Sequence, residues 1–153
     1  MTQQRLSAPK IAPDGYKTLT GVETYLRQCG LEQGLIELVK MRASQINGCA
    51  YCLDMHSKDA RRAGESEQRL YLLDAWQESS LYTPRERAAL AWTEALTRVA
   101  DTHAPDAAYG ALRPHFSEKE IVDLTILAGM INLWNRLAIG LRTQHSVATG
   151  KAA

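Results

Sequence analysis

The chain lacks an excess of either charge. Its 153 residues include 18 Lys and Arg against 17 Asp and Glu, which leaves a formal net charge of +1 at pH 7. Proteins that bind nucleic acid or anionic membrane surfaces depend on clustered basic charge for much of their affinity. We therefore expect neither a nucleic acid nor a membrane among its partners.

We also expect no secretory leader, because the first ten residues, MTQQRLSAPK, contain no apolar run. The longest apolar stretch, residues 121–141, includes Asp123, Asn132, Asn135 and Arg136. Polar side chains of this kind are costly inside a bilayer, so the stretch is typical of a buried helix. Together these features predict a cytoplasmic protein.

Cysteine is scarce, with three residues in the whole chain. An odd number without a secretory leader argues against a framework of structural disulfides. Cys49 and Cys52 stand three residues apart, and His56 follows four residues later. In a cytoplasmic protein this spacing indicates redox or metal chemistry. Cys29 lies apart from the group, and we interpret it as a plain core or surface thiol.

No segment shows a convincing strand pattern, so we predict an all-α fold in one domain over residues 16–153. An extended arm over residues 1–15, which contains Pro9 and Pro13, is expected before it. Six to seven helices follow from the apolar periodicity and from helix-capping residues. They are expected over about 16–28, 32–47, 49–63, 67–78, 83–101, 106–112 and 117–141.

Two of these helices begin with a capping box, at Thr83-Pro84-Arg85-Glu86 and at Ser117-Glu118-Lys119-Glu120. Residues 121–141 are apolar nearly all round, which is typical of a central helix or of one shared with a partner subunit. We expect Trp76, Trp92 and Trp134 to fill the core or an interface.

If the segment is helical from Cys49 onward, the positions of the two cysteines and the histidine suit thiol chemistry. Residues three, four and seven apart share one helix face, so Cys49, Cys52 and His56 point the same way. The positive end of the helix dipole favours a thiolate at Cys49. The imidazole of His56 can accept the proton of Cys52. Both cysteines therefore have a route to a reactive thiolate.

Several functions fit these residues. The pair could reduce a peroxide, with a sulfenic acid on one thiol resolved by the other, or exchange with disulfide substrates. Cys49, Cys52 and His56 could also bind zinc, although no fourth ligand is evident. The simplest alternative is two buried core thiols beside a histidine.

A longer pattern resembles a known family. Glu37, eleven further residues and then Cys49-x-x-Cys52-x-x-x-His56 resemble the signature of the alkyl hydroperoxidase D (AhpD)-like proteins of the carboxymuconolactone decarboxylase superfamily. The stretches MRASQINGC over 41–49 and NLWNR over 132–136 support the resemblance, which covers about residues 20–145.

The resemblance implies an all-helical homo-oligomer, often a trimer or hexamer, with peroxidase activity and no cofactor. It implies that Cys52 attacks the hydroperoxide, Cys49 resolves the product, His56 accepts a proton and Glu37 ends a proton relay. An external dithiol would restore the thiols. The rival functions are a redox-sensing or structural oligomer without enzymatic activity, and decarboxylation of a lactone, for which two cysteines would not be needed.

Two features fit this family pattern less simply. On a helical wheel Glu37 lies opposite the apolar stripe of its helix, which alone predicts that it faces solvent. It can serve the site only if that helix is covered on both sides. Some family members have a histidine between the cysteines, where this chain has Ala50-Tyr51. Asn132, Asn135 and Arg136 need polar partners, and we expect these across an interface or near the site.

Overall fold

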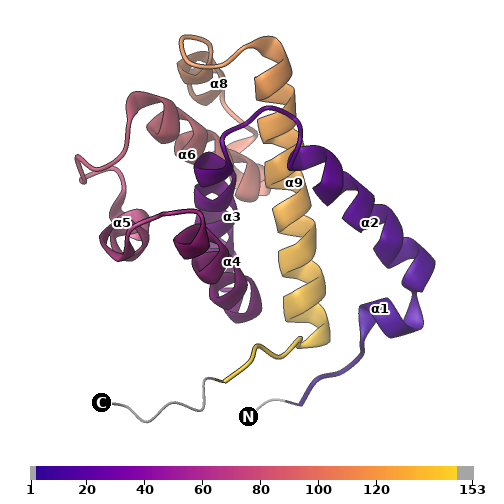
Figure 1. The fold of residues 1–153 in the computed structure, drawn as a ribbon. Coiled ribbons are helices and arrows are strands. Elements are labelled where there is room, and N and C mark those ends of the chain that lie inside the picture. Colours follow the sequence, from indigo (N-terminus) through magenta and orange to yellow (C-terminus); the bar gives the residue numbers. More distant parts are fainter. Residues whose placement is uncertain (1–2, 148–153) are drawn as a thin grey trace, which may run out of the picture.

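A computed structural model describes residues 3–147, which contain helices and no strand (Figure 1). The all-α prediction is therefore confirmed. In chain order the elements are α1 (Ala8–Ile11), α2 (Pro13–Leu26), α3 (Gln33–Asn47), α4 (Ala50–Arg62), α5 (Glu67–Leu72), the 3₁₀ turn η1 (Leu73–Ala75), α6 (Pro84–Thr97), α7 (Val99–Thr102), α8 (Asp106–Leu112) and α9 (Glu118–Leu141).

The seven predicted helices correspond to α2, α3, α4, α5, α6, α8 and α9, and both predicted capping boxes are present. The expected extended arm is wrong for residues 8–15. Pro9 lies in the first turn of α1, and Pro13 begins α2. A proline is favourable there because the first backbone N–H groups of a helix have no partner within the helix.

Helix α3 lies at the centre of the molecule and packs against α4, α6 and α9 (Figure 1). All ten residues from 35 to 44 are buried. A helix that is amphipathic in sequence is thus covered on every side. This burial decides the position of Glu37, because its side of the helix also lies inside the protein.

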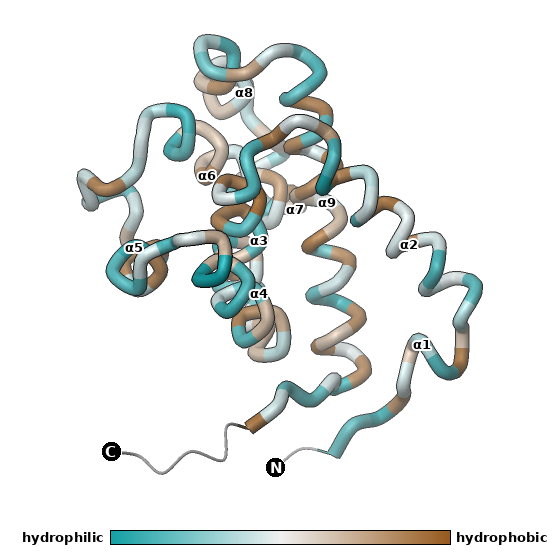
Figure 2. Tube along the Cα trace, in the orientation of Figure 1, coloured by the Kyte–Doolittle hydropathy of each residue, from teal (hydrophilic) through white to brown (hydrophobic). Residues whose placement is uncertain are grey.

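Helix α9 has hydrophobic residues along its whole length (Figure 2). By length and hydropathy alone it could cross a membrane. It packs instead against α2, α3, α4 and α6, and its polar residues Asp123, Asn132 and Asn135 are buried with hydrogen-bond partners. These contacts identify it as the core helix of the bundle, as its interrupted apolar pattern predicts.

The core has two main clusters. The larger one joins α3, α6 and α9 through residues such as Val39, Ala89 and Leu127, and it includes Trp92. The second lies beneath α5 and includes Leu73 and Trp76. Full burial of one such aliphatic side chain contributes about 1.5–3 kcal/mol. The expected core positions of Trp76 and Trp92 are confirmed.

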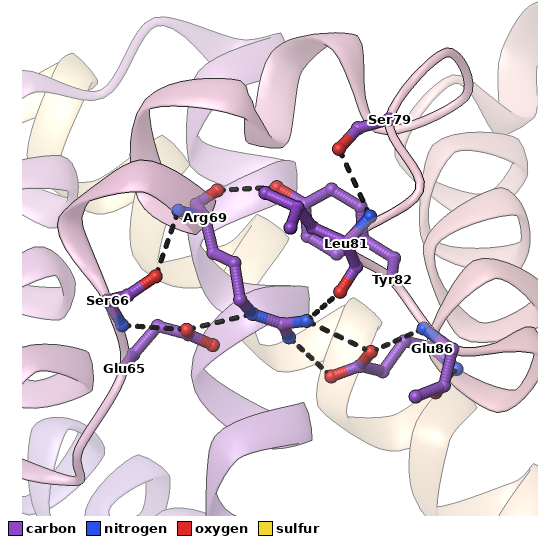
Figure 3. A network of polar contacts seen from close by, with 8 residues as sticks. Glu65, Ser66, Arg69, Ser79, Leu81, Tyr82 and Glu86 are labelled. Carbon is purple, nitrogen blue, oxygen red and sulfur yellow. Dashed lines mark hydrogen bonds and ion pairs between the residues drawn. The ribbon is translucent and has the colours of Figure 1, made fainter.

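An ion-pair network attaches the loop before α6 to α5 (Figure 3). Arg69 pairs with Glu65 at 2.8 Å and with Glu86 at 2.5 Å, and Tyr82 donates a hydrogen bond to the Arg69 carbonyl. Burial opposes the charge of Arg69, but the hydrogen bonds to the two carboxylates leave its pKa above the ordinary value. This network is structural and lies outside the cysteine group.

Candidate functional site

The junction of α3 and α4 places the two cysteines. Gly48 ends α3 in the left-handed conformation, with φ of 68°. The next N–H, of Cys49, bonds back to the Ser44 carbonyl at 3.0 Å, as in a Schellman cap. Cys49 is then extended and forms the N-cap of α4. One residue therefore closes α3 and opens α4, which gives Cys49 little freedom to move.

Cys49 and Cys52 form a disulfide, with 5.4 Å between their Cα atoms. The Cys49 sulfur also accepts a hydrogen bond from the Cys52 N–H at 3.4 Å. Each residue is 1% exposed. The spacing thus brings the two sulfurs within bonding distance, as a redox pair requires. In this state they cannot join His56 in the zinc site considered above, because they are bonded to each other.

His56 lies one turn further along α4, and its Nδ1 is 3.0 Å from Oε2 of Glu37 on α3. Glu37 is 4% exposed, so the prediction that it faces solvent is wrong. The physical reason is the cover of α3 on all sides. Gln33 donates a hydrogen bond at 2.7 Å to the other Glu37 oxygen. The carboxylate is therefore held by two side chains.

This pairing determines how the imidazole can act. An ionised carboxylate only accepts hydrogen bonds, so the proton of neutral His56 belongs on Nδ1. Nε2 is then left with a free lone pair. The positive charge that the ring gains on accepting a proton is stabilised by the adjacent Glu37. Arranged in this way, His56 can act as a base.

Cys52, His56 and Glu37 line one cavity of about 490 Å³. Its aromatic wall includes Tyr16 and Trp134, which meet edge to face with ring centroids 5.2 Å apart. Residues at the amino-terminal end, including Gln4 and Pro9, complete the cavity. It is large enough for an organic molecule, and Trp134, which was expected in the core or at an interface, lies in its wall.

Cys49 does not line this cavity but borders a second one of about 270 Å³. Tyr51 and Ala138 border both cavities. The two cysteines of one disulfide therefore border different cavities.

The sequence reasoning did not include Gln33 or Asp59. Asp59 follows His56 by three residues on α4, and helical spacing from the histidine could have indicated it. Its carboxylate, the Glu37 carboxylate and the His56 ring provide potential metal ligands within 4.8 Å of one another. This set could hold a cation, and it differs from the zinc set considered from the sequence.

The predicted polar partners of the α9 asparagines lie within the chain. Asn47, at the end of α3, donates to Asn132 at 2.9 Å and to Asn135 at 2.8 Å. Asn135 in turn donates to the Ser44 hydroxyl at 3.0 Å. The carbonyl of Ser44 is the one that accepts from Cys49. The network therefore holds the carboxyl-terminal end of α3, which directly precedes Cys49.

Comparison with known proteins agrees with this geometry. The model of the "Carboxymuconolactone decarboxylase family" matches residues 13–95. An uncharacterised protein of Bacillus subtilis, YdfG, is 44% identical over 138 residues, covering 90% of this chain and 94% of that protein. The chain belongs to the carboxymuconolactone decarboxylase family.

Solved structures of similar proteins confirm that this family member has the AhpD-like fold. A protein of unknown function from Agrobacterium tumefaciens, proposed as an antioxidant defence protein AhpD, is 48% identical. The match has a TM-score of 0.92 and covers 95% of this chain and 99% of that one. A peroxidase-related protein of Ralstonia eutropha with an AhpD core has a TM-score of 0.80 at 21% identity, covering 91% and 74%. The latter likeness concerns the fold alone.

Proposed function

We propose that this protein is a thiol-dependent peroxidase that reduces organic hydroperoxides through Cys49 and Cys52. The observation that carries the proposal is that one sulfur of a disulfide-forming pair shares a cavity with a buried histidine–carboxylate pair. A merely structural disulfide would not need a base beside it. The relationship to the Agrobacterium protein supports the same conclusion.

The first step begins from the reduced protein. His56 takes the proton of Cys52, and Glu37 stabilises the charge on the ring. The Cys52 thiolate attacks the terminal oxygen of the hydroperoxide, and the O–O bond breaks. The alkoxide leaves and takes the proton back from His56 as an alcohol. Cys52 is now a sulfenic acid.

The second step closes the disulfide. Cys49 releases its proton, its thiolate attacks the Cys52 sulfur, an S–S bond forms, and the departing hydroxide takes up that proton to become water. The Cys52 N–H that contacts the Cys49 sulfur stabilises a thiolate at this position. An external dithiol then reduces the disulfide. The cycle needs no cofactor, and we propose that it runs in the cytoplasm in a homo-oligomer, a trimer or hexamer.

The rival proposal is a redox sensor whose disulfide forms without turnover. A sensor and a peroxidase differ in catalytic rate and not in the presence of the disulfide. Steady consumption of peroxide in the presence of a dithiol therefore separates them.

The test uses purified, reduced protein with cumene hydroperoxide and dithiothreitol. We expect peroxide consumption that Cys52→Ser abolishes. In Cys49→Ser a sulfenic acid should accumulate on Cys52 and react with dimedone. Cys29→Ser is the matched control, because this half-buried third thiol lies outside both cavities, and it should retain full activity. Full turnover in both Cys49→Ser and Cys52→Ser would overturn the proposal.

A further inference from the structure

The two cavities beside the disulfide lead to a second assignment, which rests on the proposed function. We propose that the cavity next to Cys49 binds the reductant, and that an anionic thiol attacks the Cys49 sulfur there. The peroxide reaches Cys52 through the larger cavity. Oxidant and reductant thus approach the same disulfide from different sides.

The first part of this proposal rests on the different cavities that Cys49 and Cys52 border. Cys52 lines only the larger cavity, and Cys49 lines only the smaller one. Both residues are 1% exposed, so a reagent must enter a cavity to reach either sulfur. Thiol–disulfide exchange requires direct contact of the attacking thiolate with one sulfur. A thiol in the smaller cavity therefore lies beside Cys49, whereas Cys52 does not border that cavity.

The two cavities differ in their charged residues. The larger cavity is lined by three carboxylates, of Glu23, Glu37 and Asp59, and by two cations, Arg27 and Lys40, of which Lys40 pairs with Glu23 at 2.7 Å. Among the described residues that line the smaller one there is no carboxylate, and Arg142 and His145 are present. The amino-terminal end of α4 also borders it through Cys49 and Ala50. Both features attract a negatively charged ligand.

The opposing end of α9 does not cancel this attraction. Its last carbonyls already accept hydrogen bonds, those of Gly140 and Leu141 from Arg5 and that of Ala138 from the Thr143 N–H. The negative end of the helix is thereby largely satisfied by donors of the chain itself. A thiol that carries a carboxylate or sulfonate is thus the chemical class that this cavity suits.

Reduction of the disulfide takes two exchange steps. A reductant thiolate attacks Cys49 Sγ, a new S–S bond forms, and the Cys49–Cys52 bond breaks. Cys52 leaves with the electron pair as a thiolate and can take a proton from His56. A second thiolate, on the same reductant molecule or on another one, then attacks the reductant's sulfur in the mixed disulfide. This releases Cys49 as a thiolate and yields the reductant as its disulfide.

The test measures the two half-reactions separately. Ala50 and Met55 are both exposed on α4, but Ala50 lines only the smaller cavity and Met55 only the larger. Since a misplacement of about 1 Å between reacting groups can cost about 10²-fold in rate, Ala50→Trp should slow reduction of the disulfide by excess 2-mercaptoethanesulfonate at least about tenfold. Its oxidation by cumene hydroperoxide should remain within about twofold of wild type. Met55→Trp should have the opposite effect.

The charge assignment has its own measurement. Arg142→Gln should slow reduction by 2-mercaptoethanesulfonate several-fold and leave the rate with neutral 2-mercaptoethanol nearly unchanged. Added salt should reduce the difference, because it screens exposed charges. Equal rates of Arg142→Gln and wild type with the anionic thiol would overturn the anionic class of the reductant.

The attacked sulfur can be identified directly. Oxidised protein is treated with excess 2-mercaptoethanesulfonate, quenched with acid and N-ethylmaleimide, and sequenced by mass spectrometry. We expect the thiol adduct on Cys49 and the alkyl group on Cys52. An adduct on Cys52, or unchanged reduction in Ala50→Trp, would refute the assignment. Neither experiment uses peroxide, so failure of the proposed peroxidase activity would be seen separately in the oxidation assay.

Discussion

His56 and Glu37 come from two adjacent helices, nineteen residues apart in sequence, and meet at 3.0 Å with both side chains buried. The contact joins His56 on α4, the helix that also carries Cys52, to the central helix α3. A buried pair of this kind fixes the ring and supplies the charge that a protonated imidazole needs. The most direct prediction concerns this pair.

Glu37→Gln should reduce the rate at which Cys52 reacts with hydroperoxide by at least about tenfold, because each 1.4 kcal/mol of lost charge stabilisation is a factor of ten. The pH dependence of that rate should also change, which a purely structural role would not cause. Stopped-flow oxidation between pH 5 and 9 measures both. Asp54→Asn, which changes a partly exposed carboxylate on α4 outside the cavity, is the control. An unchanged pH profile in Glu37→Gln would contradict the relay.

The sequence predicted this site in part. The spacing of Cys49, Cys52 and His56 is local, and within one helix spacing alone determines which side chains share a face. The α3 residue Glu37 was assigned only through the family pattern. Its own helical wheel predicts exposure, because a wheel does not report how many neighbours a helix has. Only the tertiary packing of α3 makes the residue buried.

Other features could not be read from the sequence for the same reason. The extended arm was expected because Pro9 and Pro13 break periodicity, whereas both prolines lie in first turns of helices. The pairing of Asn47 with the asparagines of α9 spans more than eighty residues. Capping boxes, by contrast, depend on four adjacent residues and were predicted correctly at Thr83 and Ser117.

Asn135→Ala should lower the free energy of unfolding by about 2–3 kcal/mol, because Asn135 is fully buried and its loss removes one hydrogen bond of Asn47 and the donor to the buried Ser44 hydroxyl. Chemical denaturation followed by circular dichroism measures this. Gln28→Ala, which removes an exposed amide, should stay within about 0.5 kcal/mol of wild type. Equal stability of the two variants would show that the network contributes little.

Glu86→Gln should destabilise the protein by about 1–2 kcal/mol at pH 7, because it removes a charge-assisted hydrogen bond with Arg69. Burial raises the pKa of Glu86, but the hydrogen bond from Arg69 and those at Thr83 leave it below the ordinary value. A carboxyl whose pKa is lowered on folding adds stability above its unfolded pKa of about 4.3. That stability is lost as the pH falls through the lower, folded-state pKa.

The difference between Glu86→Gln and wild type should therefore be complete at pH 7 and shrink below about pH 4. Thermal unfolding over this range tests it. Glu67→Gln provides the comparison, because its pair with Arg61 is about half exposed on both sides and should contribute less than about 0.5 kcal/mol. A stability difference between Glu86→Gln and wild type that is constant with pH would argue against the role of the Glu86 charge.

The proposed homo-oligomer has a candidate surface on α9. Val122, Ile126 and Leu133 lie on its exposed side, and they are 57%, 38% and 36% exposed. Burying them in a second copy is favourable, at about 25 cal/mol per Å². Leu133→Glu should therefore shift the oligomer toward smaller species in light scattering. Tyr71→Glu, on α5 and 74% exposed, should leave the size unchanged. A wild-type protein that is monomeric at micromolar concentration would contradict the proposal.

Gly48→Ala should affect both stability and the redox pair. Gly48 has φ of 68°, and a side chain in the left-handed conformation costs about 1–2 kcal/mol. The strain acts on the residue directly before Cys49, so the equilibrium between disulfide and dithiol should shift as well.

Gly21→Ala is the matched control, because Gly21 lies within α2, has φ outside the positive range and has open space for a Cβ. It should instead stabilise the protein by about 0.5–1 kcal/mol. Denaturation measures the change in stability, and equilibration with dithiothreitol buffers measures the change in the disulfide–dithiol equilibrium. A Gly48→Ala protein that matches wild type in both would show that the α3–α4 turn does not constrain Cys49.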